Sequence, residues 1–123
     1  MSEGREKATV LKLADGIRFA AGPDHWSTPP LTVPLGSWIA LVPEVSEPAV
    51  DPSGPLAWIL ATMREPVRGT VELFGDNVYQ LGMNARQRLR ANIGFVHGYG
   101  GLLSGLSVRE NIALPVSVHR RLK

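Results

Sequence analysis

Residues 36–60, GSWIALVPEVSEPAVDPSGPLAWIL, contain the pattern that decides the fold. The segment 37–42 is continuously apolar, which is typical of a strand covered on both faces of a sheet. The segment 53–64 is predicted as a helix, because its proline stands in the first turn, where proline is tolerated. A strand, a loop and a helix in this order can hold a phosphate group at the helix N-terminus. The loop at 43–55 is therefore the first candidate for a binding site.

The size and composition of the chain indicate one globular domain over residues 1–123. Hydrophobic residues make up 44% and charged residues 20%, both in the normal range. We expect residues 1–8 to be a flexible N-terminus and residues 116–123 a basic tail. The absence of cysteine excludes disulfides and thiolate metal sites, and no apolar run approaches the ~20 residues of a membrane span. A cytoplasmic protein is expected.

The rest of the sequence predicts short elements of a mixed α/β fold. A loop is expected at 20–30 and a short polar helix at 84–92, and the expected strands lie at 9–19, 31–34, 70–74 and 93–97. The strand pattern at 9–19 is broken by a turn signal, so we expect two strands there. Ser107 and Glu110 match a capping box, so a helix is expected to begin at Ser107 and to end before Pro115.

Three stretches together resemble the ATP-binding subunits of ABC transporters, and in particular the branch that serves lipid transport with mammalian-cell-entry (MCE) domain proteins. They are GSWIALV (36–42), PVRGTVELFGDNVYQL (66–81) and RQRLRANIGFVHGYGGLLSGLSVRENIALP (86–115). The order and spacing agree over roughly residues 8–120. The resemblance implies a truncated P-loop NTPase-like ABC ATPase core with an antiparallel β subdomain. It also places the family's signature motif, Walker B carboxylates and switch histidine beyond Lys123, so we expect no ATP hydrolysis.

In this resemblance the loop at 43–55 is the Walker A region, but its chemistry is altered. A working phosphate loop needs glycines, a lysine for the terminal phosphates and a hydroxyl for magnesium. The loop has one glycine, no lysine and no arginine, and the lysine position falls near Ser53. It carries Glu44, Glu47 and Asp51, which would repel a triphosphate, and four prolines, which lack N–H donors. The residues of this degenerate Walker A region are Pro43, Glu44, Ser53, Gly54 and Pro55.

We therefore expect neither a bound nucleotide cofactor nor a metal ion. The three carboxylates could bind calcium, but their irregular spacing does not match an EF-hand loop, and a solvated acidic loop is favoured. Phe19 is the candidate base-stacking residue by resemblance, although a core position suits it better. Trp38 and Trp58 flank the altered loop and are expected to fill core space.

The resemblance places the Q-loop, where such subunits receive a permease, next to the third stretch. Gly98 stands at the position of the Q-loop glutamine, so this motif is also degenerate. A catalytic role for the neighbouring histidine is disfavoured, because no second histidine or carboxylate lies near it in sequence. The Q-loop region and expected partner contact consists of His97, Gly98, Tyr99, Leu102, Leu103, Leu106 and Val108.

Arg86, Arg88 and Arg90 form a basic helix face that is interpreted as solvated. The patch is small, the net charge is only +2 and no aromatic platform accompanies it, so nucleic-acid binding is not expected.

Three functions remain open from the sequence. The first is a non-hydrolysing accessory or regulatory subunit of a transporter, directed at lipid, at the inner face of the cytoplasmic membrane. It would bind a permease or an intact ATPase subunit and meet the membrane only through that partner. The second is a small-ligand or nucleotide module that uses Phe19, His97 and arginines in the remnant cleft. The third is a self-associating structural protein, because unpaired strand edges favour a homo-oligomer.

Overall fold

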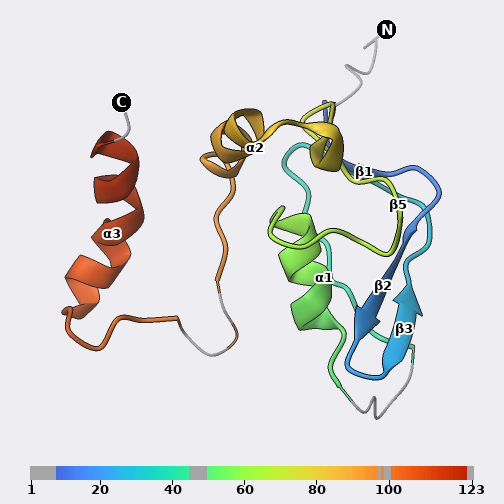
Figure 1. Cartoon of the computed structure of the whole chain (residues 1–123), viewed down its shortest axis with the longest axis horizontal. Helices are drawn as coiled ribbons and strands as arrows, with labels where there is room; N and C mark the ends of the chain where they lie inside the picture. Colours follow the sequence, from blue (N-terminus) through green and yellow to red (C-terminus); the bar gives the residue numbers. More distant parts are fainter. Residues whose placement is uncertain (1–7, 45–49, 97, 99–100, 122–123) are drawn as a thin grey trace, which may run out of the picture.

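The structure is a computed structural model that describes residues 8–44, 50–96, 98 and 101–121, with the side chains described up to residue 118. It has a mixed α/β fold with two small antiparallel sheets (Figure 1). The strand order is β4-β1-β6-β7 in the four-stranded sheet and β3-β2-β5 in the three-stranded sheet. The antiparallel β part of the expected fold is therefore present.

The four-stranded sheet is built around β1 (Thr9–Leu13). On one side β1 pairs with β4 (Leu31–Pro34), and on the other with β6 (Glu72–Leu73), which continues to β7 (Asp76–Asn77). Alternate residues of β1 point into the core, as expected for a sheet with one face in solvent. The predicted strands at 31–34 and 70–74 are thus confirmed, the second over a shorter range.

The three-stranded sheet is built around β2 (Ile17–Ala21), which pairs with β3 (Asp24–Ser27) and β5 (Arg68–Gly69). The predicted division of 9–19 into two strands is confirmed. The predicted loop at 20–30 is wrong, because the glycine and proline between β2 and β3 form a two-residue hairpin turn, in which Gly22 has φ of +60°. Turn residues here connect paired strands and do not mark a long loop.

Gly69 allows β5 to approach β2 closely. Its φ is +101°, and a Cβ at this position would lie 2.5 Å from the carbonyl oxygen of Gly16. Only glycine fits such a contact without displacement of backbone. The glycine of the P-x-x-G turn that begins at Pro66 therefore has a packing role in this chain.

Two helical segments complete the core. α1 (Ser53–Leu60) buries Leu56 and Ile59 and lies beside β2, and a 3₁₀ turn (Val78–Gln80) leads into α2 (Met83–Arg90). The core consists of apolar side chains from both sheets and these helices: Leu11, Leu13, Ile17, Phe19, Val33, Leu56, Ile59, Val71, Leu73, Val78 and Leu89. The predicted helices at 53–64 and 84–92 are confirmed, with ends shifted by a few residues.

The segments 37–42 and 93–97 were both expected to be strands, but residues 37–42 and 93–96 form none, and residue 97 lies outside the described residues. Trp38 is 99% exposed and Val96 is 89% exposed. Both segments are apolar in the way that central strands are, but within the described residues no strand lies beside either of them. The parallel core of a P-loop fold is consequently not formed by the described residues.

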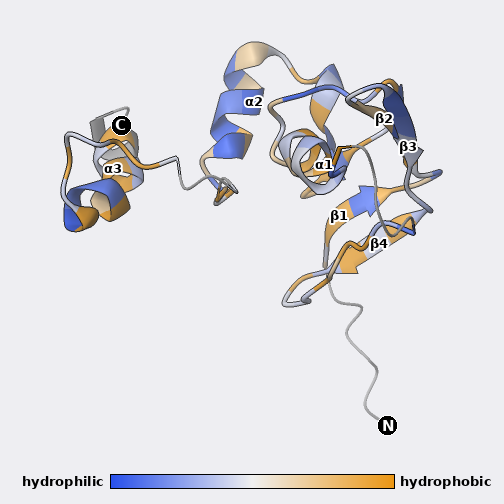
Figure 2. Ribbon diagram, turned by 90° about the horizontal axis from the view of Figure 1, so that it is seen from below, coloured by the Kyte–Doolittle hydropathy of each residue, from blue (hydrophilic) through white to orange (hydrophobic). Residues whose placement is uncertain are grey.

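α3 (Val108–Arg121) stands apart from the sheets, at the end of a long connection (Figures 1 and 2). The expected capping box begins it: the N–H of Ser107 donates to Glu110 Oε2 at 2.7 Å, and the N–H of Glu110 donates to Ser107 Oγ at 3.3 Å. The expected end before Pro115 is wrong, because the helix runs through that proline. Pro115 has no backbone N–H to donate, but its presence does not stop the helix.

Candidate functional site

The first turn of α1 is already occupied by a carboxylate of this chain. Asp51 Oδ1 accepts a hydrogen bond from the backbone N–H of Ser53 at 2.9 Å. This N–H, together with the Ser53 side chain, holds the pKa of Asp51 below its usual value. Ser53 is the first residue of α1 and also the position at which the resemblance places the phosphate-loop lysine. An anion approaching this helix end would meet a fixed negative charge.

The neighbouring residues of the Walker A region do not form a tight backbone cradle. A Cβ added to Gly54 would have no heavy atom within 4 Å, and Gly54 has an ordinary negative φ. Glu44 is exposed, Pro43 and Pro55 are half-buried, and the prolines contribute no N–H donors. No lysine or arginine occurs between Arg18 and Arg64. The described part of this loop thus offers few donors and no cation to a phosphate. Glu47 lies outside the described residues.

Phe19 is a core residue. It is 3% exposed and stands opposite Trp26 in the pairing of β2 with β3. Its ring is therefore not available to stack on a base. The expectation that Phe19 is a core residue is confirmed. A ligand site that uses Phe19 as a contact, as the small-ligand hypothesis required, is not compatible with this burial.

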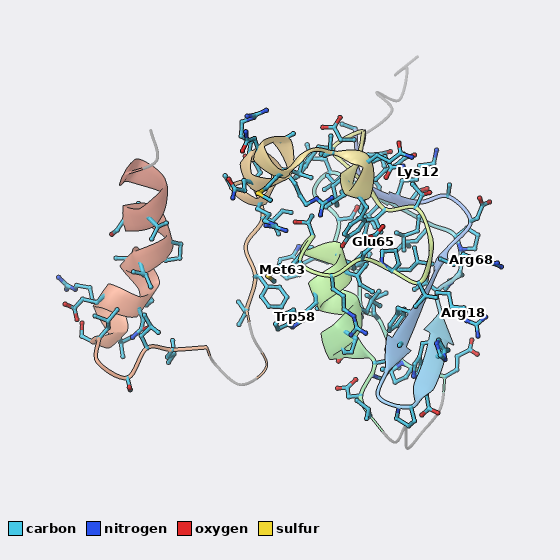
Figure 3. The ribbon with its side chains drawn as sticks, in the orientation of Figure 1. Lys12, Arg18, Trp58, Met63, Glu65 and Arg68 are labelled. Atoms are coloured by element: carbon cyan, nitrogen blue, oxygen red, sulfur yellow. The ribbon has the colours of Figure 1, made fainter. Side chains whose placement is uncertain are left out.

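The two tryptophans that flank the loop differ from the expectation. Trp38 does not fill core space, because its segment has no neighbouring strand and the side chain is almost wholly exposed. Trp58 lies on the outer side of α1, near Met63 (Figure 3), and packs edge-on against Phe95 with ring centroids 6.3 Å apart. The expectation of core filling is wrong for Trp38 and only partly met by Trp58, which is 43% exposed.

The C-terminal end of α1 is held by α2 and the turn that precedes it. Arg90 donates from Nε to Thr62 Oγ1 at 2.8 Å and from a terminal nitrogen to the Thr62 carbonyl oxygen at 2.7 Å. Thr62 is 1% exposed and has φ of +68°, so these bonds satisfy its polar groups in a conformation that is rare for threonine. The single hydroxyl proton of Tyr79 is shared between the carbonyl oxygens of Ile59 and Arg64. Burial raises the pKa of Tyr79 to about 12, against the lowering effect of Arg86.

The interpretation of the α2 arginines as a solvated face is wrong for two of the three. Arg86 and Arg90 are half-buried and turn toward the protein. Arg86 donates to the carbonyl oxygens of Tyr79 and Leu81 at 3.3 Å and lies over the Tyr79 ring, 5.2 Å from its centroid. Only Arg88 is exposed among them. Two of the three cations are therefore structural, which further weakens the case for nucleic-acid binding.

A hollow of about 550 Å³ lies between the β6–β7 turn and α2. Its lining consists of Phe74, Asp76, Leu81, Ala85, Arg88, Leu89 and Asn92. None of the described residues of the loop at 43–55 contributes to it. This hollow is thus separate from the candidate phosphate site.

The expected partner contact is exposed where the structure describes it. Leu102, Leu103 and Val108 are exposed, Leu106 is half-buried and Gly98 is open, whereas His97 and Tyr99 lie outside the described residues.

Sequence reasoning missed the residue that organises this stretch, Asn111. Its side chain accepts from the N–H of Leu103 at 2.8 Å and donates to the carbonyl oxygens of Leu103, Leu106 and Ser107. An asparagine one position after the capping-box glutamate was the available signal, since asparagine readily bonds local backbone.

Comparison with known proteins gives related sequences. The chain is 31% identical over 94 residues to the lipoprotein-releasing system ATP-binding protein LolD of Shewanella denitrificans, a match that covers 76% of this chain. It is 32% identical over 123 residues to LolD 1 of Rhodopseudomonas palustris, across 92% of this chain. It is 31% identical over 93 residues, 76% of this chain, to the phosphonates import ATP-binding protein PhnC of Pseudomonas fluorescens. These relatives are ATP-binding subunits of ABC transporters. No family model matches the chain.

The matches cover only part of each relative. They span 39% of the Shewanella protein, 51% of the Rhodopseudomonas protein and 31% of the Pseudomonas protein. The chain thus spans between about a third and a half of the length of these curated relatives. Among the described residues no group of three histidine, aspartate or glutamate side chains could hold a metal ion. No helix in the described part of the chain is long and apolar enough to cross a membrane.

Proposed function

We propose that the chain is a non-hydrolysing, ABC ATPase-like accessory or regulatory subunit of a membrane transporter. The similarity to transporter ATP-binding subunits supports the transporter link. The single observation that supports the loss of nucleotide binding is the state of the α1 N-terminus. There Asp51 occupies the N–H of Ser53, at the position where a lysine would neutralise phosphate. Like charges a few ångströms apart repel each other even with solvent screening.

The lipid direction of this transport is part of the proposal. Two of the relatives are by name parts of a lipoprotein-releasing system, and the sequence itself resembles the branch that serves MCE-type lipid transport. A subunit of this kind would be cytoplasmic and would sit at the inner face of the membrane through its partner. That partner would be a permease or an intact ATPase subunit, and the exposed leucines at 102 and 103 would belong to the contact.

A titration with a fluorescent ATP analogue and magnesium tests the loss of nucleotide binding. The Shewanella relative serves as the positive control, and the expected result for this chain is no saturable signal at analogue concentrations that saturate the relative. The variant Asp51→Gly/Ser53→Lys removes the carboxylate and restores a cation. It should bind the analogue more tightly than the wild type, because repulsion is replaced by attraction. Saturable micromolar binding by the wild type would contradict the proposal.

Co-purification tests the transporter link separately. A tagged chain should retain a permease or an intact ATPase subunit from its own host membranes. The variant Leu102→Glu/Leu103→Glu should lose that partner, while Met83→Glu, a change at an equally exposed apolar residue of α2, should keep it. Retention of the partner by the first variant would exclude this surface as the contact.

A further inference from the structure

The central strand of each sheet carries an outward-facing cation, but the two cations have different neighbours. In β1, Lys12 stands opposite Thr32 of β4 on one side and opposite Glu72 of β6 on the other. An opposite charge directly across an antiparallel pair stabilises the pair. The outward-facing cation of β2, Arg18, has a neighbour of its own sign instead.

A row of three side chains crosses the outer face of the three-stranded sheet. Arg18 of β2 stands opposite Ser27 of β3 and opposite Arg68 of β5. Residues that stand directly opposite each other share one face of a sheet, with Cβ atoms about 4.5–5.5 Å apart. This face is the outer one, because Ile17 and Phe19, which alternate with Arg18 along β2, are buried in the core. Both arginines are exposed, on the side of β2 that faces away from α1 (Figure 3).

The two arginines repel each other in this arrangement. Like charges directly opposite each other destabilise an antiparallel pair, and in the described part of the chain neither guanidinium forms an ion pair or a hydrogen bond. The register cannot shift to separate them, because Gly69, the residue after Arg68, is the glycine that fits closely against Ile17. The repulsion therefore belongs to the β2–β5 pairing itself. A local rule broken without compensation is typical of a functional position.

We propose that Arg18 and Arg68, together with the hydroxyl of Ser27, bind a phosphate group. Each guanidinium presents five N–H donors in a planar fork that matches the oxygens of a phosphate. A phosphate monoester carries close to two negative charges at neutral pH, which balances the two guanidinium charges. A carboxylate brings one charge and two oxygens, so it complements the pair less completely. The phosphate group belongs either to a small phosphorylated molecule or to the headgroup of an anionic lipid.

This site is separate from the loop at 43–55, because it lies on the face of β2 that is turned away from α1. Water and salt weaken contacts between exposed charges, so we expect a dissociation constant for inorganic phosphate on the order of 1 mM. That is far weaker than the micromolar nucleotide binding that would contradict the function proposed above. The two proposals also fail separately: binding through the arginine pair responds to Arg68→Gln, whereas binding at α1 responds to Asp51→Gly/Ser53→Lys.

Titration with inorganic phosphate at constant ionic strength tests the site directly, followed by NMR of the arginine Nε–H groups. The signals of Arg18 and Arg68 should shift saturably with one common dissociation constant. Arg88, an exposed arginine of α2, is the matched control and should show no saturable shift. No saturation, or equal shifts of all three signals, would overturn the proposal. The same result would follow if acetate shifted the pair at equal or lower concentration, because the pair would then prefer a carboxylate.

Thermal unfolding of Arg68→Gln gives a readout that a purely structural arginine would not give. Without phosphate the variant should be at least as stable as the wild type, because the repulsion is removed. With phosphate well above the dissociation constant, the Tm of the wild type should rise by a few degrees more than that of the variant. The difference is the informative quantity, since phosphate also stabilises proteins non-specifically. Arg88→Gln should respond as the wild type does. An equal response of Arg68→Gln, or a lower Tm of this variant without phosphate, would overturn the proposal.

Flotation of the full chain with phosphatidylcholine vesicles, with and without phosphatidic acid, distinguishes the two sources of the phosphate. If the source is a lipid headgroup, the chain should float only when phosphatidic acid is present, and Arg18→Gln/Arg68→Gln should not float. If the source is a small phosphorylated molecule, the chain should stay in solution with both vesicles while the phosphate titration still saturates. Flotation that the double variant retains would overturn the assignment of the lipid headgroup to this pair.

Discussion

β1 and the segment 37–42 contain similar apolar residues but have opposite surroundings. β1 has a strand on each side and buries Leu11 and Leu13, whereas the segment 37–42 has no neighbouring strand in the described structure and leaves Trp38 in solvent. The sheets around β1 and β2 are antiparallel, and all of their partners lie within the described chain: β3 follows β2 in a hairpin, whereas β4, β5 and β6 reach β1 and β2 across intervening elements. A central strand covered on both faces needs distant segments as neighbours. An apolar sequence pattern thus indicates that a segment is suited to burial. Whether the segment is buried depends on neighbouring strands being present to cover it.

The segment 93–96 repeats this contrast beside α2. The Arg90 side chain at the end of α2 is bound to Thr62, while Val96, six residues later, is 89% exposed. We call the two sheets with α1 and α2 the closed part of the chain, and the segments 37–42 and 93–96 together with α3 the open part. The boundary after α2 therefore falls within one short stretch of chain. Four measurements would break or sharpen this comparison.

The largest effect is expected from the same substitution in the two parts. Leu13→Ala removes a fully buried side chain from the core and should lower the free energy of unfolding by about 2–5 kcal/mol. Leu41→Ala lies in the open segment and should cost less than about 1 kcal/mol. Urea unfolding measures both. Equal losses would mean that the segment 37–42 is packed in solution, and the contrast would fail.

The next effect concerns two arginines of α2. Arg90→Met keeps the length of the side chain but leaves the buried polar groups of Thr62 without their donors, so stability should fall by about 1–3 kcal/mol. Arg88→Met changes an exposed residue on the same helix and should alter stability by no more than about 0.5 kcal/mol. Thermal unfolding of both variants ranks them. A result in which Arg88→Met is the more damaging would refute the assignment of Arg90 as the structural cation.

A smaller effect is expected from the titration of Tyr79. Its pKa of about 12 in the folded chain lies above the ordinary value of 10.0, so folding favours the neutral phenol. The resulting stabilisation is fully present below about pH 10 and is lost as the pH rises through about 12. Because the side chain is half-buried, solvent screening reduces this contribution to the order of 1 kcal/mol.

The variant Tyr79→Phe isolates this group from the other residues that titrate in alkali. It should be less stable than the wild type near neutral pH, because the carbonyl oxygens of Ile59 and Arg64 lose the hydroxyl donor that they share. The difference between the two proteins should shrink as the pH rises from about 10 to about 12. Denaturant unfolding at several pH values provides the measurement. A difference that stays constant over this range would show that the hydroxyl is not perturbed.

Local patterns predicted most of the closed part. The turn at Asp15–Gly16 and the strand expected at 70–74 follow from spacings within a few residues, and so does the capping box at Ser107, which begins α3 outside the closed part. Features that depend on distant partners were not predicted. The bond between Arg90 and Thr62 joins residues 28 positions apart, and the exposure of Trp38 depends on strands that would have to come from elsewhere.

The candidate site shows the same limit. The altered chemistry of the loop at 43–55 is visible in its residue types, and an aspartate two positions before a helix start was a readable sign of the bond from Ser53 to Asp51. The inward turn of Arg86 and Arg90 could not be read from the sequence, because a basic helix face looks the same whether it is solvated or bound to carbonyl groups. The continuation of α3 through Pro115 likewise overrides a local helix-stop signal.

The smallest effect on global stability is expected in α3, which lies apart from the core. Ser107→Ala removes one of the two reciprocal capping bonds, worth about 1 kcal/mol to a helix, and leaves the bond from the Ser107 N–H to Glu110 in place. Because α3 does not pack against the sheets, this loss should remain local. Amide hydrogen exchange should be faster throughout the first turns of α3, while the urea midpoint of the closed part should not move. Ser117→Ala is the control, since its hydroxyl bonds within the helix to the Ala113 carbonyl and caps nothing. If Ser107→Ala lowered the global midpoint, α3 would have to fold together with the β1 and β2 sheets, and the division between a closed part and an open part would no longer describe the protein.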